Sequence, residues 1–176
     1  MAKQKLKYET VLNDFLKARK WTDSLDVDLE NKSVSLRSGI RFGQISGKLI
    51  IEAYDTTDLV DVYIYFDVTC KDTKLDQMAL LMNGIHQRWE FGRFVVFPDG
   101  YMRWQHRVDF EGSEPTGLSI ERIVGPGWDT AERFGEFISS VALTKQTAAD
   151  ALEEYAAIVE AERKAQEEDD KGPSEL

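Results

Sequence analysis

The chain has 176 residues, of which 42% are hydrophobic, so it is long enough to build one domain with a substantial core. Its net charge of −10 disfavours binding to nucleic acid or to anionic membranes, because both need clustered Lys and Arg. Cys70 is the single cysteine, which excludes an internal disulfide and a thiolate metal cluster.

The N-terminal residues MAKQKLKYET contain basic side chains but no apolar segment of the kind found in secretory signals. No apolar run in the sequence is long enough to span a membrane. We therefore expect a cytoplasmic protein that binds neither membrane nor nucleic acid.

Apolar residues at three- and four-residue steps predict an amphipathic helix over residues 4–20. Alternating apolar and polar residues then predict strands at Leu25–Glu30, Ser33–Arg37, Lys48–Tyr54 and Leu59–Cys70. Three glycines within Ser38–Gly47 predict a loop, or a bulged strand around Ile40 and Phe42.

A second helix is predicted over residues 74–88, and its apolar arc is wider than a single packing seam requires. The width indicates burial on two sides, either deep inside the domain or against a second subunit. In the second case the chain is a homodimer, with an interface formed by Met78, Leu81, Met82 and Ile85.

The stretch Phe91–Phe110 predicts a β-hairpin, because two alternating apolar runs flank Pro98-Asp99-Gly100. Three helices are expected after it. Thr116 is the predicted N-cap of the first, Gly125-Pro126-Gly127 is predicted to break it from the next, and Thr147 is predicted to cap the last.

From residue 160 onward the sequence is charged and lacks bulky apolar positions, which predicts a disordered tail over 160–176 after a single domain over 1–159. The short connections between strands predict an α+β fold, with a mostly antiparallel sheet and the helices packed on one face.

The sequence contains no recognisable catalytic motif. It lacks a G-x-S-x-G nucleophile elbow, and its two histidines, His86 and His106, have no second ligand at metal spacing. Gly39–Gly47 matches no phosphate-binding loop. We therefore predict a protein that is not an enzyme and has no metal or cofactor.

The polar sides of two predicted strands are the candidate partner-binding surface, since aromatic and arginine side chains alternate with buried ones there. These residues are Tyr63, Tyr65, Tyr101, Arg103 and Arg107. The arginines either pair with Asp61 and Asp109 within the chain or bind an acidic segment of a partner.

The second helix, with Asn83 near its end, leads into Arg88–Val96 and then into the turn at Asp99-Gly100. This succession resembles the YbjN family of bacterial sensory-transduction regulators, over residues 5–158. The family often has a second Asn shortly after the first, whereas this chain reads Gly84-Ile85-His86-Gln87-Arg88 there.

The resemblance implies a fold similar to that of type III secretion (Tir) chaperones, with the order α-β-β-β-α-β-β-α. Those chaperones are small, acidic, cytoplasmic dimers that hold partner polypeptides in extended form. It implies a protein or peptide partner and a regulatory or chaperone-like role. The alternative is a small-ligand-binding or enzymatic domain with a pocket near Trp104, His106 and Glu52.

Overall fold

The computed structural model describes residues 5–89 and 91–169. A short 3-10 turn at Asp72–Lys74 precedes α2. The elements in chain order are α1 (Lys7–Arg19), β1 (Leu25–Asp28), β2 (Ser33–Phe42), β3 (Ile45–Tyr54), β4 (Leu59–Phe66), α2 (Leu75–His86), β5 (Arg93–Val96), β6 (Met102–Asp109), α3 (Gly117–Leu143) and α4 (Ala148–Asp169). None of the helices in these ranges has the length and apolar character needed to span a bilayer.

The six strands form one sheet in the order β1-β2-β3-β4-β6-β5, and every neighbouring pair is antiparallel. This confirms the predicted α+β class with an antiparallel sheet. Four strands precede α2, as the alternation predicted, and two helices follow β6, so the order differs at these two points from the α-β-β-β-α-β-β-α that the resemblance implies.

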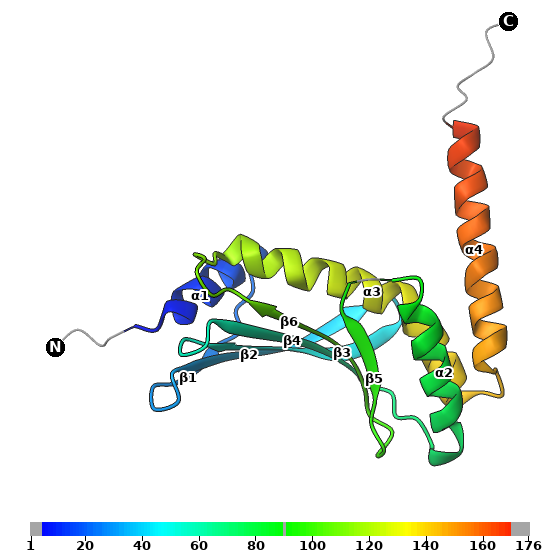
Figure 1. Ribbon diagram of the computed structural model, residues 1–176, viewed down its shortest axis with the longest axis horizontal. Helices are drawn as coiled ribbons and strands as arrows, with labels where there is room; N and C mark the ends of the chain where they lie inside the picture. The colour runs from blue at the N-terminus through cyan, green and yellow to red at the C-terminus, as the bar shows by residue number, and fades with distance from the viewer. Residues whose placement is uncertain (1–4, 90, 170–176) are drawn as a thin grey trace, which may run out of the picture.

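The sheet is buried on one face only. Helices α1 and α3 lie over that face, while α2 packs beside β5 at the end of the sheet (Figure 1). Alternate residues of each long strand point under the helices, and Val60, Val62 and Ile64 of β4 are fully buried there. No helix of the described residues covers the opposite face, as predicted from the alternation (Figure 1).

The predicted loop within Ser38–Gly47 is wrong, because β2 and β3 continue through it to a short turn at Gly43-Gln44. The register runs without a bulge from Ser33 opposite Tyr54 to Phe42 opposite Ile45. Ile40, Phe42 and Ile45 are buried, so the apolar period of two extends the strands past the glycines.

The predicted helix break at Gly125-Pro126-Gly127 is also wrong, since α3 is continuous from Gly117 to Leu143. Proline inside a helix removes one backbone hydrogen bond and strains the preceding turn. Here Thr130 Oγ1 donates to the Pro126 carbonyl at 2.5 Å, and buried residues on either side hold both halves against the sheet. Burial therefore outweighs the local cost of the proline.

The wide apolar arc of α2 is buried by other elements of the same chain. Met78, Leu81, Met82 and Ile85 are each 3% exposed or less in the single chain, where α2 contacts β5, α3 and α4. Gly84 lets α4 approach, because a Cβ there would lie 2.4 Å from the Leu152 side chain. An interface on these four side chains is thus not needed to explain the arc.

The last two helices begin as predicted. Thr116 Oγ1 accepts a hydrogen bond from the Ser119 amide in a capping box, and Thr147 Oγ1 accepts one from the Asp150 amide. Helix α4 runs to Asp169, so it includes residues 160–169 of the expected tail; the division into a domain over 1–159 and a tail over 160–176 stays a prediction. The end of α4 projects away from the sheet (Figure 1); residues 170–176 lie outside the described residues.

Two neighbouring glycines of α3 give a matched test of this packing. A Cβ at Gly127 would lie 2.5 Å from the buried Trp104 ring, whereas a Cβ at Gly125 meets nothing closer than 3.6 Å. We predict that Gly127→Ala lowers the free energy of unfolding by roughly 1–3 kcal/mol through overpacking. Gly125→Ala should change it by less than about 1 kcal/mol, because the gain in helix propensity is opposed by the steric strain of a Cβ directly before Pro126. Urea unfolding of both variants checks this, and a stabilising Gly127→Ala would contradict the packing.

Candidate functional site

The uncovered side of the sheet, called here the open face, carries the candidate residues. The neighbouring strands β4 and β6 present three polar or aromatic side chains each: Asp61, Tyr63 and Tyr65 from β4, and Arg103, Gln105 and Arg107 from β6. Arg93 of β5 lies opposite Gln105. The structure therefore brings four of the five predicted partner-binding residues together on two adjacent strands.

Arg103 is held in a fixed position by hydrogen bonds and by aromatic rings. Its Nε donates to Gln105 Oε1 at 2.8 Å, and its Nη1 donates to Tyr65 Oη at 2.5 Å. The guanidinium lies 4.2 Å from the centre of the Tyr63 ring and 5.0 Å from that of Phe97. These contacts fix a cation between aromatic rings, and it forms no ion pair with any carboxylate of the described residues.

Arg107, unlike Arg103, forms an ion pair with a buried carboxylate. Its Nε and Nη2 donate to the two oxygens of Asp61 at 2.6 and 2.7 Å. The Asp61 side chain is 4% exposed and that of Arg107 is 63% exposed. The hydrogen bonds to Asp61 raise the pKa of Arg107. Of the two alternatives for this arginine, the structure shows the pair with Asp61.

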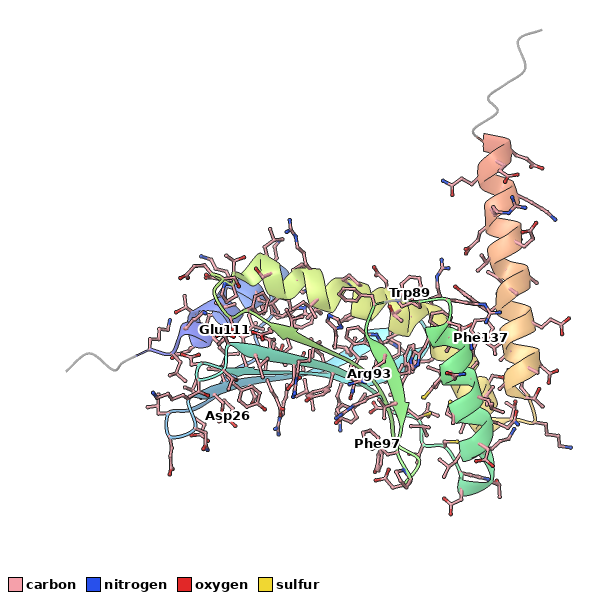
Figure 2. The ribbon with its side chains drawn as sticks, viewed as in Figure 1. Asp26, Trp89, Arg93, Phe97, Glu111 and Phe137 are labelled. Carbon is pink, nitrogen blue, oxygen red and sulfur yellow. The ribbon has the colours of Figure 1, made fainter. Side chains whose placement is uncertain are left out.

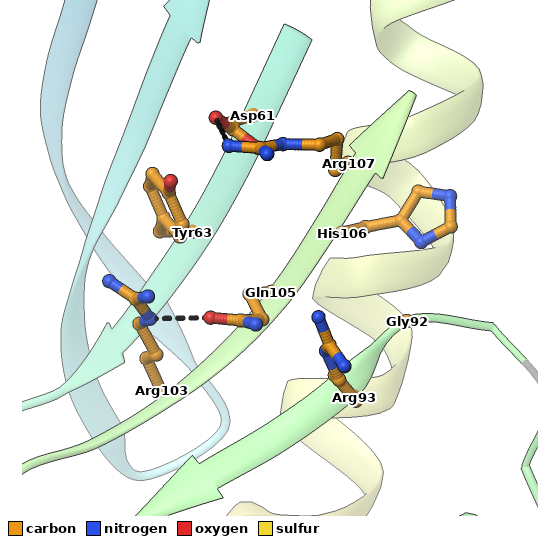
Figure 3. Close-up of a pocket in the computed structure, with 8 residues that line it drawn as sticks. All are labelled: Asp61, Tyr63, Gly92, Arg93, Arg103, Gln105, His106 and Arg107. Atoms are coloured by element: carbon orange, nitrogen blue, oxygen red, sulfur yellow. Dashed lines mark hydrogen bonds and ion pairs between the residues drawn. The ribbon is translucent and has the colours of Figure 1, made fainter. Parts of the chain in front are cut away.

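A hollow of about 450 Å³ lies where β5 begins, beside the part of β6 that continues past it (Figure 3). Side chains of β4, β5 and β6 surround it (Figure 3). The residues that line it are Asp61, Tyr63, Gly92, Arg93, Arg103, Gln105, His106 and Arg107. Three guanidinium groups face one carboxylate here, so the lining is positive in a chain of net charge −10.

Tyr63 supplies an uncharged hydroxyl to this hollow. Burial and the nearby Asp61 carboxylate raise the pKa of Tyr63. The phenol is therefore protonated at neutral pH and can donate a hydrogen bond. Together with Gln105 and the arginines, it gives the hollow mainly hydrogen-bond donors.

Tyr101 lies apart from these residues. It follows the hairpin turn, where its carbonyl accepts from the Phe97 amide, and it is 54% exposed. Phe97 and Gln105 were not among the predicted site residues. The alternation placed Gln105 on the polar side of its strand, whereas Phe97 lies beyond the end of β5 and no period reveals its contact with Arg103.

The predicted trio for the alternative small-ligand pocket does not assemble. Trp104 is fully buried, and its Nε1 donates to the Phe91 carbonyl at 3.2 Å. Glu52 accepts from Tyr54 Oη and does not line the hollow, whereas His106 lines it and stacks on Phe91, with ring centres 4.5 Å apart. Burial lowers the pKa of His106, which favours the neutral imidazole.

Among the described residues, no group of three His, Cys, Asp or Glu is placed to hold a metal ion. Cys70 is buried, and burial raises the pKa of its thiol.

No protein-family model matches the sequence, and no curated protein matches it. Solved structures with a similar fold include a chain of the HopA1–SchA chaperone–effector complex, at 15% identity and a TM-score of 0.48. They also include a chain of the ExsC–ExsE complex, at 15% identity and a TM-score of 0.50. Each match covers 73% of this chain and 91% of the other. The likeness concerns the fold, and the YbjN resemblance stays a prediction.

The Asp61–Arg107 pair gives a stability prediction. Arg107→Gln leaves a buried carboxylate without its cation, so we expect the free energy of unfolding to fall by roughly 1–3 kcal/mol. Asp61→Asn in the same chain should recover part of this loss, which urea unfolding of the single and double variants measures. Arg93→Gln is the control on the same face. An Arg107→Gln variant as stable as this control would contradict the assigned pair.

The two histidines give a pH prediction. His86 Nε2 accepts a hydrogen bond from the Phe94 amide at 2.8 Å, and burial together with Arg93 lowers the pKa of His86. The pKa of His106 is also lowered, so both contribute stability that is present above about 6.5 and lost as the pH falls through their folded-state values.

We therefore expect the free energy of unfolding to decrease as the pH falls below about 6.5, above the range where most carboxylates titrate. His86→Gln keeps an acceptor for the Phe94 amide and should flatten this decrease. Unfolding at several pH values and NMR titration of the imidazoles measure it. Imidazole midpoints at or above about 6.5 would contradict the burial of these rings.

Proposed function

We propose that this chain is a non-enzymatic protein-binding domain with a chaperone-like role, which holds an extended polypeptide segment on the open face. The observation that carries the proposal is the fixed cluster of Arg103 with Tyr63, Tyr65 and Phe97 on a face that no described helix covers. Arginine and tyrosine dominate the energetics of protein interfaces. Here they are already ordered, so binding would cost little side-chain entropy.

The fold likeness supports this proposal in one respect. The ExsC–ExsE structure is a complex of two proteins, and one of its chains shares the architecture of this domain. We extend protein binding to this chain because its open face has the aromatic and arginine composition of an interface. We also propose the narrower regulatory role, in sensory transduction, on the residues that resemble the YbjN family.

A cytoplasmic location and a homodimer belong to the same proposal. The dimer would need a surface other than Met78, Leu81, Met82 and Ile85, since the chain itself buries these side chains. Sedimentation that shows only a monomer at micromolar concentration would exclude the homodimer. It would not affect the proposal that partners bind the open face.

Binding to an array of unrelated short peptides tests the proposed function. We expect a subset to bind, and Tyr63→Ala to weaken their binding by about tenfold or more, as for an anchor residue. Tyr54→Ala is the matched control, because Tyr54 lies on the same face, four residues along the ladder from Tyr63, and does not line the hollow. It should leave binding unchanged.

Thermal unfolding of both variants would show that they are folded. Two results would contradict the proposal: no peptide bound by the unaltered chain, or equal losses in the two tyrosine variants.

A further inference from the structure

The charges of the open face are segregated along the strands. The cross-strand register places Asp26 and Glu52 near Asp61 at one end. Basic side chains gather toward the other: Arg37, Arg41, Lys48, Arg93 and Arg103. Asp26 and Arg93 also lie on opposite edge strands of the sheet, β1 and β5 (Figure 2). A segment bound at the hollow therefore meets positive charge, although the whole chain is acidic.

The hollow keeps two positive charges that the described residues do not neutralise. Arg107 is bound to Asp61, so its charge is compensated. Arg93 is exposed and, within the described residues, has no hydrogen-bonded or ion-paired side-chain partner. Arg103 binds only neutral groups, namely Gln105 and Tyr65.

The field inside the hollow is set by these nearby groups. Charges separated by more than about 8 Å are largely screened at physiological ionic strength, so the distant carboxylates of the chain count little there. Arg93 and Arg103 come from neighbouring strands and flank Gln105, whose Oε1 is taken by Arg103. The amide nitrogen of Gln105 remains as a donor, whereas the Tyr63 hydroxyl lies toward Asp61 (Figure 3).

We propose that this hollow is a carboxylate-recognition site, which takes an Asp or Glu side chain of the bound segment between Arg93 and Arg103. The proposal rests on the proposed function, because the carboxylate arrives as part of a polypeptide. A guanidinium pair with an additional neutral donor matches the acceptor-only oxygens of a carboxylate. The ring of Tyr63 lines the same hollow and offers an apolar contact to the methylenes of the side chain.

A pair of fluorescein-labelled peptides tests the site. Both have the same apolar residues in alternation, and one has Glu where the other has Gln. Fluorescence anisotropy should show the Glu peptide binding about tenfold more tightly, as expected for a desolvated charge pair. Arg93→Gln should remove most of that difference, whereas Arg122→Gln, an equal charge change on the exposed side of α3, should preserve it.

Rising salt should weaken binding of the Glu peptide. N-acetylglutamate should compete with the Glu peptide more than with the Gln peptide, and inorganic phosphate should compete less well than N-acetylglutamate. Equal binding of the two peptides would overturn the carboxylate site and leave the proposed function standing. Absence of binding by either peptide would overturn both. Binding that strengthens with salt, or phosphate as the better competitor, would overturn the carboxylate assignment alone.

Discussion

The contact between Trp104 and α3 determines which side of this sheet is free. Trp104 is fully buried, its ring lies against the backbone at Gly127, and its Nε1 binds the Phe91 carbonyl. This one side chain thus joins β6 to the long helix and to the chain entering β5. Because side chains alternate along a strand, an inward Trp104 directs Arg103 and Gln105 outward.

That alternation explains why a functional cluster forms on the open face without a catalytic motif. Tyr63 and Tyr65 are outward on β4 for the same reason, and the register places them beside Gln105 and Arg103. The short β5 begins only at Arg93, which leaves the hollow beside the rest of β6. The helices cover one face of the sheet, and β5 begins only opposite Gln105. Together these two features create an ordered, positively charged hollow on an acidic protein.

The structural features that follow from the periodicity of apolar residues could be predicted from the sequence. The helices, the hairpin, the buried face of β4 and both threonine caps follow local patterns, and the fold class is confirmed. The continuity of α3 was not predicted, because tertiary burial outweighs the helix-breaking effect of Pro126. The short β2–β3 turn was not predicted, because the glycines around it are typical of a longer loop. At the site, the alternation located Arg103 and Tyr63. The contacts of Phe97 and the choice of Asp61 for Arg107 depend on three-dimensional register, which residue types alone do not give.

We propose that partners bind the open face of the sheet rather than the helices. Amide hydrogen exchange of the chain, with and without a saturating bound peptide, measures this directly, because bound backbone exchanges more slowly. We expect added protection in β4, β5 and β6 around the hollow, with α3 and α4 unchanged. Added protection confined to α2 and α4, with none in β6, would contradict it.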